Sequence, residues 1–429
     1  MRLVEGFAAA RAALERRVDP LQDPAKEETV RQIIAEVQQR GDAAVLEFIE
    51  RFDGVKLTSL DVSKEGVQEA YRRVDEEVVG ALEQAAVRIR DFYAQQKDVL
   101  LRGGGKAGLG WVMRPLARVG IEVPGFSAAL PSSVLMTAVP AKVAGVGEII
   151  LTTPPQKSGR VAPLTLVAAD IAGVDRIFSV GGAQAIAALA FGTQSIPAVD
   201  KVCGPGNIYV VLAKKLLFGT VGIDALQGPS EVLIVADDSA DARYCASDLL
   251  AQAEHGAGAT AAMVTTSRKL ADRAAREIER QVRGLATRET AARALETSGV
   301  MAVVASIDEA IELANLYAPE HLLLMVEDSE KCVDRIRNAG CIVLGPKATV
   351  ALGDYVAGPS HILPTGGTAR FGSPLSVLDF VKQTNVISVN DRLLAEIGPA
   401  AETIARAEGL AAHARAVELR LEKKEETKP

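Results

Sequence analysis

Two successive series of short apolar runs and helical patterns constrain most strongly how this chain can fold. Between about residues 117 and 237, β-rich runs such as "EIILTT" and "EVLIVAD" alternate with helical stretches such as "GAQAIAALAFG". The alternation starts again after Ala240 with "CASDLLAQAEHG", "TAAMVTTS" and "HLLLMV". Since this order places parallel strands side by side with helices on their faces, the sequence predicts two similar α/β units.

Helical patterns flank these two series. In "EETVRQIIAEVQQRG", Val30, Ile33, Ile34 and Val37 fall on one helical face, and Gly41 suits the end of that helix. Beyond about residue 378 the pattern is purely helical and ends in a charged tail. We expect this last piece to dock on a partner subunit.

Composition narrows the class of protein. A chain of 429 residues is long enough for two or three compact units, and 48% hydrophobic with 24% charged residues is typical of globular enzymes. The net charge of −7, with no basic run, argues against a nucleic-acid partner. No stretch reaches the apolar length of a membrane span or a signal peptide, so a cytoplasmic location is expected.

Cysteine and glycine motifs give weaker signals. The four cysteines show no C-x-x-C spacing, and Cys203 is read as a buried filler in preference to a nucleophile. No G-x-G-x-x-G fingerprint opens a helix in either unit. The turns in "VGGAQAI" and "CGPGN" could present backbone amides to an anion, although such turns are more often structural.

All four histidines lie in the second half of the chain, and each has other ligand-type residues nearby. Taken singly, each is more often a satisfied, partly buried imidazole. Together they form a set of nitrogen and oxygen donors without thiolate, which suits zinc or manganese in a site open to substrate. The groups are Gln252, Glu254 and His255; Glu320 and His321; Asp354 and His361; and Glu408 and His413.

Nine ordered stretches carry a resemblance to a known family: "RGDAAVLEFIERFDG", "LPSSVLMTAVPAKVAGV", "VGGAQAIAALAFGT", "VDKVCGPGN", "QGPSEVLIVAD", "LLAQAEHG", "APEHL", "GDYVAGPSHILPTGGTAR" and "EGLAAHARAV". In these stretches the chain resembles the histidinol dehydrogenases. The resemblance covers essentially the whole sequence, and nine blocks in order are far more specific than any single motif.

The resemblance implies two Rossmann-like parallel-sheet domains without the usual fingerprint, small helical terminal segments, and an intertwined homodimer with shared active sites. The predicted N-terminal arm spans 1–20. A first α/β domain, formed by 21–118 and 234–377, is expected to carry most of the catalytic site. The second α/β domain, 119–233, is inserted in it, and a helical segment, 378–429, is expected to reach the partner subunit.

The resemblance also assigns residues. The implied ligands of one Zn²⁺ per subunit are Gln252, His255, Asp354 and, from the partner subunit, His413. Implied contacts to NAD fall on Gln184 and Asn207. The implied contacts to the substrate, L-histidinol, are Ser230, Gln252, His255, Glu320, His321, Asp354, His361, Glu408 and His413.

Members of this family oxidise L-histidinol to L-histidine through the aldehyde with two NAD molecules. An alcohol releases hydride only after it loses its proton, and His321 is the expected base. The aldehyde must then be hydrated, for which Glu320 is the expected activator of water. Zinc is expected to hold the imidazole and amine of the substrate and so to fix the reacting carbon.

Two stretches depart from the family pattern. In "IEVPGF", Glu122 stands where a tyrosine that contacts the dinucleotide is common, and Phe126 replaces a glycine. Glu122 is a candidate contact to the cofactor ribose, or else it faces solvent or repels the pyrophosphate. In "IDALQGPSE", Ala225 and Gln227 differ from the usual residues, and Gln227 is expected to add polarity beside Ser230.

These departures leave two alternatives open. One is a related dehydrogenase that oxidises another small primary alcohol to its acid, as the sulfopropanediol dehydrogenases do. The other is a catalytically silent homologue that binds zinc. The presence of all four implied zinc positions argues against the first, and the presence of Glu320 and His321 argues against the second.

Overall fold

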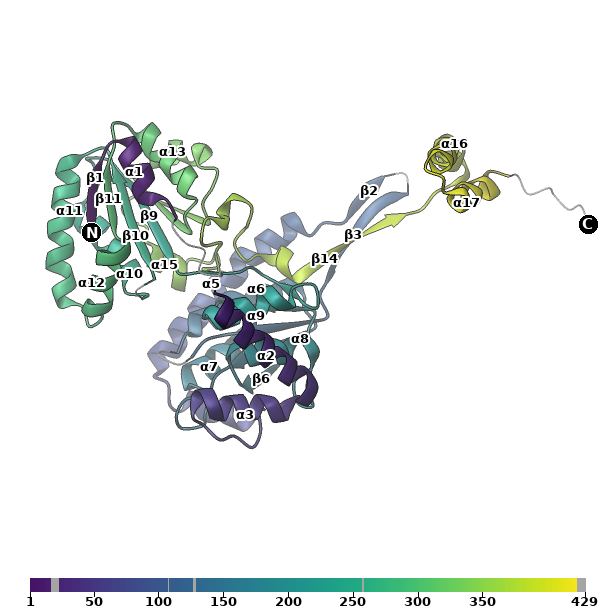
Figure 1. Ribbon diagram of the computed structural model, residues 1–429, viewed down its shortest axis with the longest axis horizontal. Coiled ribbons are helices and arrows are strands. Elements are labelled where there is room, and N and C mark those ends of the chain that lie inside the picture. Colours follow the sequence, from purple (N-terminus) through teal and green to yellow (C-terminus); the bar gives the residue numbers. More distant parts are fainter. Residues whose placement is uncertain (17–22, 107, 126–128, 257, 423–429) are drawn as a thin grey trace, which may run out of the picture. The chain divides into compact units, whose positions relative to one another are not determined.

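The computed structural model describes residues 1–16, 23–106, 108–125, 129–256 and 258–422, and these divide into two compact units. The larger unit comprises Met1–Lys97 and Leu116–Phe380, and the smaller comprises Asp98–Pro115 and Val381–Pro429. The larger unit contains two parallel sheets with helices on their faces (Figure 1). The mixed α/β fold predicted from the alternating pattern is therefore confirmed.

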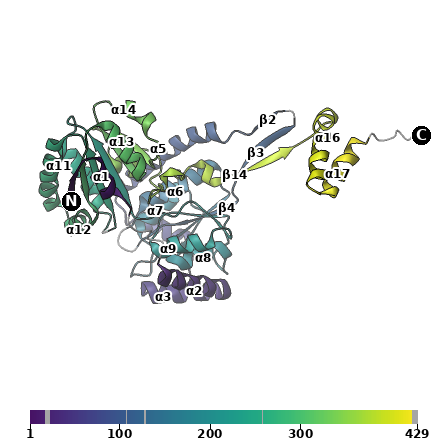
Figure 2. The same cartoon turned by 45° about the horizontal axis from the view of Figure 1, so that its top comes forward.

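The first parallel sheet has six strands, in the order β1-β11-β10-β9-β12-β13. Alternate residues of its central strands face opposite layers: Ile234 packs under α10, α11 and α12, and Leu233 packs under α1 and α13 (Figure 2). The strands are β1 (Arg2–Glu5), β9 (Glu231–Ala236), β10 (Thr260–Thr265), β11 (Val300–Val303), β12 (His321–Met325) and β13 (Cys341–Leu344). The helices are α1 (Phe7–Leu14), α10 (Ala242–Ala253), α11 (Arg268–Gln281), α12 (Arg288–Ser298), α13 (Ile307–Tyr317), α14 (Ser329–Cys332) and α15 (Val350–Tyr355).

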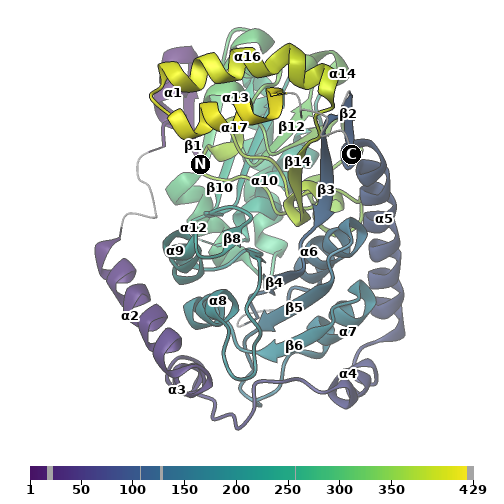
Figure 3. The same cartoon turned by 90° about the vertical axis from the view of Figure 1, so that its right-hand side faces the viewer.

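The second parallel sheet has five strands, in the order β6-β5-β4-β7-β8, with α6, α7 and α8 beside it (Figure 3). Its strands are β4 (Arg118–Glu122), β5 (Glu148–Thr153), β6 (Arg176–Ser179), β7 (Lys201–Cys203) and β8 (Gly222–Ile223). Its helices are α6 (Pro131–Ala144), α7 (Pro163–Ala172), α8 (Gly182–Phe191) and α9 (Ile208–Leu217).

The N-terminal part of the chain packs differently from the expected domain division. Residues 2–5 form strand β1 beside β11, where an arm was expected. The apolar face of Val30, Ile33 and Val37 packs on the helices of the five-stranded sheet, although it was assigned to the other domain. The helices here are α2 (Pro24–Arg40), α3 (Asp42–Asp53), α4 (Lys64–Tyr71) and α5 (Glu76–Leu100).

The smaller unit combines an antiparallel sheet, in the order β14-β3-β2, with the helix pair α16 and α17. The expectation of a purely helical C-terminal segment was wrong, because Val381–Ile387 forms a strand that pairs along its whole length with β3. The elements are β2 (Gly104–Lys106), β3 (Leu109–Pro115), β14 (Val381–Ile387), α16 (Asp391–Ala407) and α17 (Ala411–Leu421). Within the described ranges, no helix is long and apolar enough to cross a membrane.

Candidate active site

The motif "APEHL" connects α13 to β12 and buries two titratable side chains. Helix α13 ends at Tyr317, and Ala318 adopts a left-handed conformation with φ of 52°. Glu320 and His321, which follow, are only 5% and 6% exposed. A buried carboxyl and imidazole at a strand start are costly unless they are paired or used, which marks this turn as a candidate for chemistry.

Glu320 is held by the neighbouring strand. The backbone N–H of Glu231, at the start of β9, donates to Glu320 Oε2 at 2.7 Å, and Cys341 N donates to the Glu320 carbonyl at 2.8 Å. Burial raises the pKa of Glu320 well above its usual value, although the bond from Glu231 and one from Ser230 oppose the shift. A carboxyl with a raised pKa can exchange a proton with a water or substrate near neutral pH.

His321 is a neutral imidazole. Burial, followed by the nearby His361 and His255, lowers its pKa to about 3. Its Nε2 lies 3.8 Å from Glu320 Oε1, and because the ring is uncharged near neutral pH this contact is not an ion pair. His321 is thus able to accept a proton.

His361 and Asp354 come from the loop after α15. The His361 Nδ1–H donates to the Asp354 carbonyl, with the two atoms 2.9 Å apart, because a carbonyl can only accept. His361 Nε2 must then accept from the Ser133 hydroxyl at 3.2 Å, on α6. Burial lowers the pKa of His361 and raises that of Asp354 to about 7.

Gln252 and His255 sit at the C-terminal end of α10. Gln252 is 4% exposed, and none of the described groups pairs with its Nε2 atom. His255 reaches solvent, while burial of its inner side lowers its pKa. Thr349 donates to Asp248 at 2.5 Å and so ties the start of α15 to the middle of α10.

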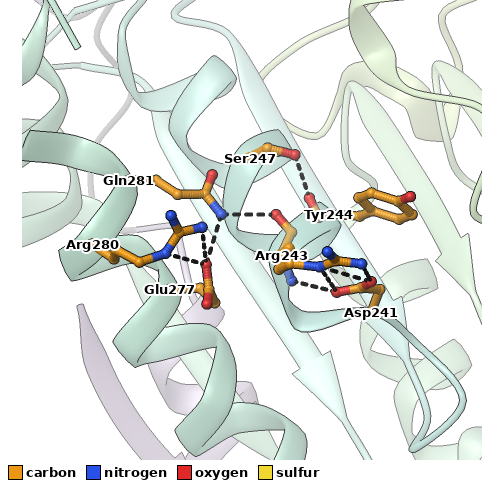
Figure 4. Close-up of polar contacts among 7 residues, drawn as sticks. All are labelled: Asp241, Arg243, Tyr244, Ser247, Glu277, Arg280 and Gln281. Atoms are coloured by element: carbon orange, nitrogen blue, oxygen red, sulfur yellow. Dashed lines mark hydrogen bonds and ion pairs between the residues drawn. The ribbon is translucent and has the colours of Figure 1, made fainter. Parts of the chain in front are cut away.

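The opposite end of α10 is fixed by polar contacts on its outer face (Figure 4). Asp241 caps the helix by accepting from Arg243 N at 2.8 Å. Gln281, at the end of α11, donates to the Arg243 carbonyl at 3.1 Å and to Glu277 at 3.2 Å. These bonds hold α10 against α11, and therefore fix the helix that carries Gln252.

These side chains meet at the amino-terminal edge of the six-stranded sheet. His321 begins β12, Glu320 immediately precedes it, and Ser230 immediately precedes β9. His255 and His361 lie near enough to lower the pKa of His321, and Ser230 and Asp354 lie near enough to affect that of Glu320. Six of the nine implied substrate residues therefore lie near one another, and Gln252 lies on α10 one turn before His255. Glu408 and His413 belong to the smaller unit.

The residues expected to contact the cofactor lie at the carboxyl edge of the five-stranded sheet. Gln184 is 4% exposed in the first turn of α8, and Asn207 caps α9 by accepting from Tyr209 N and Val210 N at 3.0 and 3.2 Å. Glu122 ends β4 and is 2% exposed. The possibility that Glu122 faces solvent is therefore excluded.

Glu122 is bound inside the protein. Its carboxyl accepts from Thr152 Oγ1 at 2.6 Å and from Gly182 N at 3.0 Å. Burial raises its pKa to about 8 despite these bonds. Since Gly182 N belongs to the N-terminus of α8, Glu122 occupies a donor that an anion could otherwise use. Phe126, the other departure in this stretch, lies outside the described residues.

Gln227 serves a different purpose from the expected one. It accepts from the buried Lys214 Nζ at 2.9 Å and donates to Asp224 at 3.0 Å, and Lys214 also forms an ion pair with Asp224. Its polarity is thus used to satisfy a buried charge pair and is not directed at Ser230. Cys203 is fully buried and burial raises its pKa, in keeping with an inert filler.

Comparison with known proteins identifies the family of this chain. The family model described as histidinol dehydrogenase matches residues 17–421. The chain is a member of the histidinol dehydrogenase family. Histidinol dehydrogenases from Dehalococcoides mccartyi (strain CBDB1) and Deinococcus radiodurans are 51% and 48% identical to it, each over 98% of this chain and 100% of theirs.

A solved structure supports the same family assignment. The crystal structure of histidinol dehydrogenase from Elizabethkingia anophelis matches with a TM-score of 0.93 at 36% identity, over 98% of each chain. This chain is therefore an NAD-dependent oxidoreductase of the histidinol dehydrogenase family. The sequence pattern did not indicate Ser133 or Glu231, although both fall within or beside the stretches that carried the resemblance.

Proposed function

We propose that this protein oxidises L-histidinol to L-histidine through L-histidinal, reducing two NAD molecules, as the last two steps of histidine biosynthesis in the cytoplasm. The observation that carries the proposal is the buried Glu320–His321 pair, with Gln252, His255 and Asp354 converging on it in a full-length family member. Two oxidations at one carbon need a base and then an activated water, and this site offers one group for each.

His321 takes the proton of the substrate hydroxyl in the first oxidation, while hydride leaves the carbon for the first NAD. Its imidazole is uncharged and therefore keeps a lone pair that can accept the proton, while burial makes it a weaker base than a solvent-exposed histidine. Glu320 then takes a proton from a water that adds to the aldehyde, and the hydrate releases the second hydride to a second NAD. Glu320 acts here in its ionised form, and because burial raises its pKa well above the usual value, this form is a stronger base than a solvent-exposed carboxylate.

The residues present fit a zinc ion. Asp354 is a half-buried carboxyl whose pKa is raised by desolvation, His255 has a lowered pKa, and the buried Gln252 amide has an unpaired nitrogen. An amide turned about its last bond would present oxygen at the same place. Among the described residues no three His, Cys, Asp or Glu side chains form a metal cluster, and a fourth ligand is assigned to His413 of the partner subunit. When bound, zinc supplies a Lewis-acidic anchor for substrate nitrogens.

NAD is assigned to the carboxyl edge of the five-stranded sheet, where ligands of open α/β sheets usually bind. Gln184 and Asn207 line two glycine-containing turns there, after β6 and β7. The Glu122 carboxyl accepts a hydrogen bond from the backbone N–H of Gly182, in the first of these turns. Its proposed role in cofactor binding is therefore to hold the backbone of that turn in place.

A homodimer with shared sites is supported by the helix pair of the smaller unit. Few residues of this helix pair are buried. On α16 and α17 only Gly398, Ala405 and Ala414 are shielded from solvent. Apolar side chains that remain exposed there are Ile397, Ile404, Leu410 and Leu419. Exposed apolar side chains of this kind are typical of an interface, and Glu408 and His413 lie on the same pair.

The reaction is tested by the number of NADH molecules formed per L-histidinol consumed. We expect two with the metal-replete protein, none after chelation, and recovery on addition of zinc. One NADH per substrate would contradict the second oxidation, and full turnover after verified metal removal would contradict the zinc assignment. No turnover with zinc and NAD bound would favour oxidation of another small alcohol.

Sharing of sites is tested by mixing two inactive variants. A His413→Ala subunit and a Glu320→Gln subunit are each expected to be inactive as homodimers. If His413 serves the site of the other subunit, heterodimers should regain one intact site and up to about half of the activity per dimer. Verified heterodimers without activity would show that each subunit supplies its own His413.

A further inference from the structure

Arg16, in the segment after α1, is half-buried against the catalytic turn. Its guanidinium forms a two-pronged ion pair with Glu231, in which Nη2 lies 2.8 Å from Oε2, and Glu231 is itself buried. It also lies over the Tyr317 ring, 4.2 Å from its centre. Arg16 lies one residue before the region that matches the family model. None of the proposed chemical steps uses Arg16.

The same guanidinium holds the backbone of the turn that leads to Glu320. Nη2 donates to the Tyr317 carbonyl at 2.9 Å and to the Ala318 carbonyl at 3.4 Å. Ala318 is the one non-glycine residue with positive φ in the described part of the chain. That conformation is unfavourable for an alanine, so it persists only where surrounding contacts enforce it. Arg16 provides two of those contacts.

A second path joins Arg16 to Glu320 through Glu231. The Glu231 carboxylate accepts from Arg16, and the Glu231 N–H donates to Glu320 Oε2 at 2.7 Å. Without Arg16, the buried Glu231 carboxylate would lose its ion-pair partner. The start of β9 would then shift to bring that carboxylate to water or to another partner. Both the backbone before Glu320 and the donor that orients its carboxyl therefore depend on one arginine.

Glycine at position 367 leaves room for this arrangement. Gly367 has φ of 83°, and a Cβ placed there would lie 3.1 Å from Arg16 Nε. The adjacent Arg370 donates to the Leu316 carbonyl, one residue before the pair held by Arg16. The loop "PTGGTAR" thus lies next to Arg16 at Gly367 and binds the residue before the same turn through Arg370.

We infer that Arg16 is a positioning residue, which fixes Glu320 and His321 through the Tyr317–Ala318 carbonyls and through Glu231. This inference rests on the proposed function, since it assigns Arg16 to the step that Glu320 serves. Lysine cannot replace it fully, because a single ammonium cannot span a carboxylate and two carbonyls in one plane.

The test compares Arg16→Met and Arg16→Lys with Arg268→Met. The control removes Arg268, an exposed arginine on α11. It forms an ion pair with Glu5, which belongs to the same N-terminal segment as Arg16. We expect Arg16→Met to lower kcat for histidinal about 10–100-fold with little change in KM, because misplacement of a reacting group acts on the transition state. Arg16→Lys should recover part of this loss, and Arg268→Met should stay within about twofold of the parent.

Hydrogen exchange separates this inference from the proposed function. Amides of residues 317–323 should exchange faster in Arg16→Met and Arg16→Lys than in Arg268→Met, even if the parent does not oxidise histidinol. Unchanged exchange there, or kcat in a folded Arg16→Met protein equal to that of the control, would overturn the role of Arg16. If Arg16→Met does not fold, Arg16→Lys gives the same decision: parent-like exchange and kcat would overturn the inference.

Discussion

Replacing His321 with Asn is expected to lower kcat for the oxidation of L-histidinol by about 10²–10⁴-fold, the usual contribution of a positioned base. Asparagine keeps a polar side chain of similar reach but cannot accept a proton near neutral pH. The buried imidazole is neutral in the parent, so the substitution removes basicity without removing a charge. The effect should therefore fall on turnover more than on stability.

Single-turnover formation of the first NADH from L-histidinol measures this step directly. The matched control is Glu312→Gln, an exposed position on α13 close to the same turn in sequence, which should leave the rate unchanged. A first-turnover rate in His321→Asn equal to that of the control would remove His321 from the role of base. Thermal unfolding of both variants shows whether a loss of activity reflects a loss of fold.

Glu320→Gln is expected to impair the aldehyde step more than the alcohol step. Glutamine can still accept the hydrogen bond from Glu231 N, so the turn should keep its shape. It cannot take a proton from water, and hydration of the aldehyde should slow by about 10²–10⁴-fold. The variant should then form one NADH quickly from L-histidinol and the second slowly.

Supplying L-histidinal separately distinguishes the two steps. The ratio of the rate with L-histidinal to the first-turnover rate with L-histidinol should fall in Glu320→Gln and stay constant in Glu312→Gln. Equal losses in both steps would mean that Glu320 acts by holding the site together, and a water-activating role would be abandoned.

Much of the fold could be predicted because it depends on local patterns. The strand in "EVLIVAD" is apolar from Val232 to Ala236, and it proved to be buried on both faces. Val30, Ile33 and Val37 were correctly placed on one buried helical face. The pattern could not say which sheet that face would cover, because any apolar layer satisfies it equally.

The C-terminal strand was missed for a related reason. "VKQTNVI" has no continuous apolar run, and only pairing with β3, more than 260 residues earlier, makes Val381–Ile387 a strand. The burial of Glu122 and the bonds of Gln227 could not be predicted, because the groups that bind them are distant in sequence or buried in the fold. Nothing in "IEVPGF" indicates that Thr152 and Gly182 will bind the Glu122 carboxyl.

The sequence by itself determined the family, the doubled α/β pattern and the residues to consider, since these depend on residue types and their order. The tertiary structure alone decided where they act. Glu320 and His321 lie at the amino-terminal edge of their sheet, opposite to the edge at which α/β proteins usually bind ligands. They do so because β9 and β12 begin side by side, so that Glu231 can hold Glu320, and because α10 returns to that edge with Gln252 and His255. Arg16, which no motif indicated, reaches the same turn only through the fold.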